Sequence, residues 1–61
     1  MRVMLADDSV LLREGLARML VESGFEVLAQ VGDADALLAA VDADPPDVCI
    51  VDIRMPPTNT T

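Results

Sequence analysis

Apolar residues fall into short blocks that predict alternating strands and helices. The run at 2–6 is continuously apolar after its arginine and ends at Asp7, which is typical of a buried strand. Ser9 can cap a helix that ends at Gly24, a residue that enters the left-handed conformation at little steric cost. Helical spacing predicts that the inward face carries Leu12, Leu16, Met19 and Leu20, with Arg13, Glu14, Arg18 and Glu22 mostly on the other side.

The middle of the chain predicts a second strand and a second helix. Residues 25–31 partly alternate apolar and polar positions, as expected of a strand near the edge of a sheet. Asp33 or Asp35 can then cap a short helix through 36–41, where acidic residues at the amino end are favourable.

A third strand is predicted at 48–51. The preceding prolines forbid further helix, and the run that follows is apolar, largely β-branched and ends on Asp52. Cys49 lies within this run and cannot form an internal disulfide, so we expect a small buried residue there. The order β-α-β-α-β with short connections predicts an α/β fold in which helices cover a parallel sheet.

Composition narrows the function classes. The 61 residues carry a formal charge of −7 with no histidine, and all four basic residues are arginines. This charge argues against binding to a nucleic-acid backbone and favours a cation as partner. No apolar stretch approaches the roughly 20 residues that span a membrane, and the amino terminus turns acidic too early for a secretory signal. We therefore expect no membrane partner and a cytoplasmic location.

Acidic residues follow two of the predicted strands. Asp7 and Asp8 come after the first strand and Asp52 after the third, and ligands of parallel α/β sheets bind at the carboxyl ends of strands. On neighbouring strands, roughly 5 Å apart, these carboxylates would repel one another unless a proton or cation intervened. Magnesium suits such a set of oxygen ligands. The alternative is that each aspartate only caps a helix or begins a loop.

The residues that carry these features resemble a known family. The stretches MRVMLADDS, PDVCIVD and IRMP are similar to the receiver domain of bacterial response regulators, nearest to the LuxR/NarL-type transcriptional regulators, over essentially all 61 residues. The resemblance implies a flavodoxin-like, doubly wound parallel sheet of which this chain supplies strands in the order 2-1-3.

The resemblance also implies roles for individual residues. Asp52 would be the phosphoacceptor, modified by the phosphohistidine of a sensor histidine kinase. Asp8 would bind Mg²⁺ directly, Asp7 directly or through water, and Asp52 and the backbone carbonyl of Arg54 would complete the ligands. Such a module is not an enzyme in its own right. DNA binding would belong to an output domain of the parent regulator, outside this segment.

The chain departs from the family pattern in two ways. A complete receiver has five β/α units, with a Ser or Thr after the fourth strand and a Lys after the fifth, and neither is found here. We therefore expect residues 1–61 to form the amino-terminal part of one receiver, without coupling to an output. The strand at 47–52 would be an exposed edge, which predicts self-association.

Two other readings stay open from the sequence. One is a structural or interaction fragment of a receiver that accepts no phosphate, which differs from the first interpretation only in the reactivity of Asp52. The other, an enzyme of the haloacid-dehalogenase type, is disfavoured, because that family needs an Asp-x-Asp arrangement after the first strand, where this chain has the adjacent acids Asp7 and Asp8.

Overall fold

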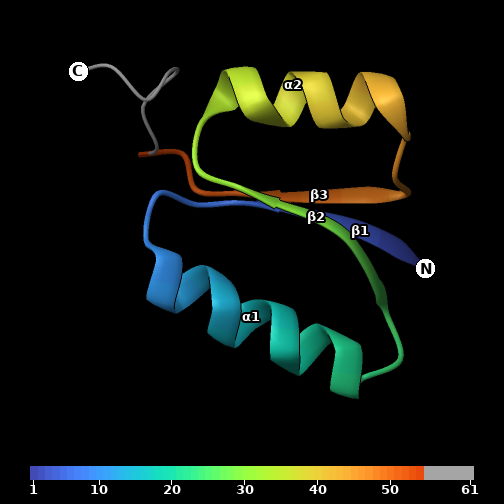
Figure 1. The fold of residues 1–61 in the computed structure, drawn as a ribbon. Coiled ribbons are helices and arrows are strands. Elements are labelled where there is room, and N and C mark those ends of the chain that lie inside the picture. Colours follow the sequence, from blue (N-terminus) through green and yellow to red (C-terminus); the bar gives the residue numbers. More distant parts are fainter. Residues whose placement is uncertain (55–61) are drawn as a thin grey trace.

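The predicted order of strands and helices is confirmed. A computed structural model describes residues 1–54 of the chain. Three strands alternate with two helices, and the first helix lies on one side of the sheet and the second on the other (Figure 1). The elements are β1 (Arg2–Ala6), α1 (Val10–Glu22), β2 (Glu26–Val31), α2 (Ala34–Ala43) and β3 (Val48–Val51).

The sheet has the strand order β2-β1-β3, and both pairings are parallel. This confirms the predicted 2-1-3 arrangement and puts β1 in the centre. Val3 is level with Val27 of β2 and Val48 of β3, and the register with β2 shifts by one residue between Val3 and Met4. All strands run in one direction, so their carboxyl ends lie along one edge of the sheet.

The core forms around β1. Its residues Val3, Met4, Leu5 and Ala6 are each no more than 2% exposed. Val3 and Leu5 pack with Ala17 of α1, and partly buried residues of α1, β2 and the turn between them surround this cluster. A central strand covered by a helix on each face explains why the run at 2–6 is continuously apolar.

Only half of the residues predicted for the inward face of α1 are confirmed there. Leu16 and Leu20 pack against the core, but Leu12 is 54% and Met19 63% exposed, and Ala17 is the buried residue. The helix contacts β1 and β2 but not β3 among the described elements, so only the side nearest these two strands is covered. Arg13, expected mostly on the outer side, is half-buried.

The predicted ends of α1 are confirmed, whereas those of α2 are only partly so. The Ser9 hydroxyl accepts a hydrogen bond from the Leu12 amide, and Gly24 has a φ of 94°. Asp33, not Asp35, caps α2 by accepting from the Ala36 amide. The helix α2 is longer than the predicted 36–41 because regular structure begins immediately after this cap and continues into the acidic residues before the prolines.

Charged side chains tie the start of β1 to the connection between α2 and β3. Arg2 forms an ion pair with Asp44, and its main-chain amide donates to an Asp47 carboxylate oxygen at 2.8 Å. The hydrogen bond and charge of Asp44 raise the pKa of the Arg2 guanidinium. Arg2 therefore stays charged at any pH at which the chain is studied, and its pairing contributes no pH dependence near neutrality.

The strand β3 is an open edge, as predicted. Val48, Cys49, Ile50 and Val51 are all exposed, so the expectation of a buried Cys49 is wrong. Apart from its pairing with β1, β3 has no neighbour among residues 1–54, and neither helix covers it. Residues 55–61, which include the end of the IRMP stretch, lie outside the described residues. Within residues 1–54, neither helix is long and apolar enough to cross a membrane.

Candidate metal centre

Backbone hydrogen bonds hold the two acid-bearing strand ends side by side. The amide of Asp7 donates to the carbonyl of Val31 at 3.0 Å, and the amide of Asp52 donates to the carbonyl of Ala6 at 2.9 Å. The sheet pairing thus continues one residue beyond the apolar part of each strand. Asp7 and Asp52 are therefore placed by the sheet itself and not by a free loop.

The structure brings the three predicted acids together. Asp7, Asp8 and Asp52 each offer a carboxylate oxygen, and these atoms lie within 4.8 Å of one another. Asp7 is buried, Asp52 half-buried and Asp8 exposed. The cluster therefore has a buried floor and one side open to solvent, through which an ion or phosphate donor could approach.

Asp7 is held by the start of α1. One of its carboxylate oxygens accepts a hydrogen bond from the Ser9 amide at 2.8 Å, and the Ser9 hydroxyl in turn caps the helix. The helix begins one residue later, so its amino end, which favours negative charge, lies beside the acids. Ser9, in the turn from β1 to α1, thus both caps the helix and orients the Asp7 carboxylate.

Asp52 has one oxygen engaged and one free of hydrogen bonds from residues 1–54. Its Oδ1 accepts from the main-chain amide of Arg54 at 2.9 Å. The Nε of Arg54 lies 3.8 Å from the same oxygen, but this side chain is 88% exposed and so contributes little as an ion pair. The carboxylate is therefore oriented by the backbone of its own turn.

The donor set fits a hard divalent cation. Mg²⁺ takes oxygen ligands at about 2.1 Å in an octahedron, which places ligands of one ion roughly 3 to 4 Å apart. Carboxylate oxygens within 4.8 Å of one another reach this spacing by small side-chain rotations. Three negative charges at this separation also repel, and a cation relieves that repulsion. The assignment of Arg54 as a carbonyl ligand stays a prediction.

Sequence reasoning missed Arg13. Its Nη1 donates to the main-chain carbonyl of Asp7 at 2.7 Å, so its side chain reaches the turn that carries the acids. Arg13 is four residues beyond the cap Ser9, a spacing that puts the two on one side of the helix. That spacing was the available signal, and the apolar pattern of α1 obscured it.

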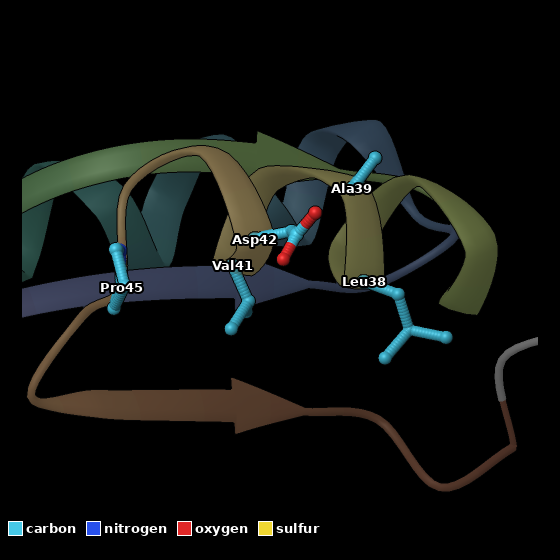
Figure 2. Close-up of a pocket in the computed structure, with 5 residues that line it drawn as sticks. All are labelled: Leu38, Ala39, Val41, Asp42 and Pro45. Atoms are coloured by element: carbon cyan, nitrogen blue, oxygen red, sulfur yellow. The ribbon is translucent and has the colours of Figure 1, made fainter.

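A hollow elsewhere on the surface does not include the acids. It lies along α2 and the connection that follows it, and is lined by Leu38, Ala39, Val41, Asp42 and Pro45 (Figure 2). Only one of these side chains is ionisable, so the hollow lacks a set of groups that could carry out chemistry. The acid cluster is the better candidate for function.

Comparison with known families agrees with this geometry. Residues 3–59 match the model of the response regulator receiver domain. The chain belongs to this family. Receiver domains of response regulators are phosphorylated by sensor histidine kinases, and they typically bind Mg²⁺ at an acidic pocket. The family resemblance drawn from the sequence is therefore confirmed.

The relatives carry different names. Two alignments that each cover 90% of this chain are to proteins of Mycobacterium tuberculosis. The chain is 38% identical to the transcriptional regulatory protein PdtaR and 43% identical to the probable transcriptional regulatory protein NarL. It is 52% identical, again over 90% of its length, to protein-glutamate methylesterase/protein-glutamine glutaminase 2 of Anaeromyxobacter dehalogenans. The chain spans 27% of PdtaR, 26% of NarL and 16% of the methylesterase. Family membership alone therefore does not fix the output of the whole protein.

Proposed function

We propose that this chain is a phosphoacceptor module of a two-component response regulator, with Asp52 as the residue that takes the phosphoryl group. The convergence of Asp7, Asp8 and Asp52 at one edge of the sheet is the observation that carries the proposal. Carboxylates placed separately as caps or loop starts would have no reason to converge.

The chemistry is transfer of a phosphoryl group to a carboxylate. A carboxylate oxygen of Asp52 attacks the phosphorus of a kinase phosphohistidine, the phosphorus–nitrogen bond breaks, and its electron pair returns to the imidazole, which takes up a proton. The product is an aspartyl phosphate. Such transfer depends mainly on positioning and charge. The hydrogen bond from the Arg54 amide, which orients the Asp52 carboxylate, is therefore the main contribution of the structure to the reaction.

The same residues would hold the cation. The carboxylates of Asp7, Asp8 and Asp52, with the backbone carbonyl of Arg54, form the ligand set that we propose for Mg²⁺. When bound, the ion would neutralise charge that develops on the transferred group. Asp7 is anchored through Ser9, whereas the exposed Asp8 is free to adjust to the ion.

Beryllofluoride binding tests this proposal, because this anion binds a receptive carboxylate as a phosphoryl group would. With Mg²⁺ present, we expect the carboxyl carbon of Asp52 to shift in carbon-13 NMR. With the metal chelated, we expect no shift. Asp42, exposed on α2, is an internal control that should stay unchanged. No metal-dependent shift at Asp52 would contradict the proposal and favour a receiver fragment that accepts no phosphate.

We extend the proposal to the protein of which this module would be a part. We propose that residues 1–61 are the amino-terminal part of one receiver in a cytoplasmic protein, and that the module itself is not an enzyme. The parent would be a transcriptional regulator that contacts DNA through a separate output domain. The names of PdtaR and NarL support this assignment, and the −7 charge supports the absence of DNA contact from this segment.

Self-association through β3 is a further part of the proposal. An exposed strand presents unpaired backbone groups to a second copy. We expect sedimentation velocity at tens of micromolar to show association that increases with concentration. Val48→Lys should abolish it, because a charged side chain on an edge strand opposes pairing. Val10→Lys, the same change at an exposed position of α1, should leave it intact. A strictly monomeric chain under these conditions would rule out the proposed association.

A further inference from the structure

The Arg13 side chain lies between the ends of β1 and β2. Its Nη1 donates to the Asp7 carbonyl at 2.7 Å, and a Cβ added to Gly32, the first residue after β2, would lie 3.2 Å from the same nitrogen. The Nε is buried and has no hydrogen-bond partner among residues 1–54. The guanidinium is therefore half-buried and lies against the backbone at the ends of both strands.

The backbone and side chain of Asp7 are held at three points. Its amide donates to the Val31 carbonyl, its carboxylate accepts from the Ser9 amide, and its carbonyl accepts from Arg13. The peptide bond whose carbonyl Arg13 holds is the one that leads into Asp8. Because the Asp8 side chain accepts no hydrogen bond from residues 1–54, its direction depends on the orientation of that peptide.

We propose that Arg13 is a positioning residue for the acid cluster. By holding the Asp7 carbonyl, it fixes the turn from β1 to α1 so that the carboxylates of Asp7 and Asp8 face Asp52. The inference rests on the proposed function, since a cation is what the acids are positioned to bind. Arg13 acts through the backbone, because its recorded contact is with the carbonyl and not with a carboxylate.

Gly32 offers a second way to disturb the same contact. It does not have a positive φ, so alanine is compatible with its backbone conformation. The nearest atom to the new methyl group would be Arg13 Nη1, closer than most real contacts allow. Gly32→Ala therefore requires the guanidinium to shift by a few tenths of an ångström, which disturbs its hydrogen bond to Asp7, while leaving every side chain of the cluster intact.

Each variant has a matched control on α1. Arg18→Met removes the same charge as Arg13→Met, but from an exposed position of the same helix. Gly15→Ala adds the same methyl group as Gly32→Ala, but with no atom within 4 Å. A difference between variant and control therefore reports the contact with the Asp7 carbonyl and not charge or side-chain size.

The first measurement needs no metal. Amide hydrogen exchange of Ser9, which donates to the Asp7 carboxylate, should be roughly fivefold faster in Arg13→Met, as for loss of one hydrogen bond, and faster in Gly32→Ala. The two controls should match the unsubstituted chain. Exchange in the β1 core verifies that every variant is folded. If Ser9 exchange in both variants equals that in their controls, the inference is overturned.

The second measurement is Mg²⁺ affinity by calorimetry. We expect about tenfold weaker binding for Arg13→Met, as for the loss of residues that orient metal ligands, a smaller loss for Gly32→Ala and partial recovery for Arg13→Lys. Equal affinity in variants and controls would overturn the inference even if the unsubstituted chain binds Mg²⁺. If that chain neither binds Mg²⁺ nor takes beryllofluoride, the proposed function fails, and Ser9 exchange alone decides whether Arg13 holds the turn.

Discussion

Replacing Asp52 with asparagine is expected to abolish phosphorylation of the chain by acetyl phosphate. The amide cannot act as the nucleophilic carboxylate, although it has nearly the same shape and can still accept the hydrogen bond from the Arg54 amide. The fold should be unaffected, because the Asp52 side chain is half-buried at the edge of the sheet and takes no part in the core. Intact mass after incubation with acetyl phosphate and Mg²⁺ measures the effect.

Asp42→Asn is the control for this experiment. Asp42 is exposed on α2 and is not a member of the acid cluster, so the variant makes the same chemical change elsewhere. It should gain the phosphoryl group as the unsubstituted chain does. If Asp52→Asn still gained one phosphoryl group, another residue would be the acceptor and the role given to Asp52 would be wrong.

Replacing Leu5 with alanine is expected to remove a large part of the chain's free energy of unfolding and to lower its urea midpoint strongly. Leu5 is 1% exposed in the central strand, and such a truncation costs about 2 to 5 kcal/mol through lost burial and the cavity left behind. A chain of 61 residues has a total free energy of unfolding of only about 3 to 9 kcal/mol. The chain has no Trp or Tyr, so far-UV circular dichroism in a urea titration is the suitable measurement.

Leu11→Ala is the matched control for the core. Leu11 is 84% exposed on α1, so its truncation should change the free energy of unfolding by less than about 0.5 kcal/mol. Similar midpoints for Leu5→Ala and Leu11→Ala would show that β1 is not the centre of the folded chain. The arrangement of the acids, which depends on β1, would then also be in doubt.

The strand ends were the most predictable part of the site. A continuous apolar run that stops at an acid identifies both a buried strand and the place where its chain direction delivers a carboxylate. Two such strands with short connections through helices must run parallel, and this brings Asp7 and Asp52 to one edge. The convergence of the acids therefore follows from patterns within single elements and from their connections, whereas the strand order 2-1-3 was expected only from the family resemblance.

Contacts between elements were less predictable. Helical spacing identifies an apolar stripe, but how much of it is covered depends on what packs against it. Leu12 and Met19 belong to the stripe and remain exposed because α1 contacts only β1 and β2 among the elements of residues 1–54. Cys49 is exposed for a similar reason, because neither helix covers β3. The apolar stripe also obscured the Ser9–Arg13 spacing, which was the available signal that Arg13 could reach the Asp7 carbonyl.

The most direct test of the account is the intact mass of the unsubstituted chain before and after incubation with acetyl phosphate, with Mg²⁺ and with the metal chelated. We expect a gain of one phosphoryl group that requires Mg²⁺, because the acids around Asp52 need a cation before an anionic donor can approach. No gain under either condition would contradict it and leave a folded member of the receiver family without acceptor activity.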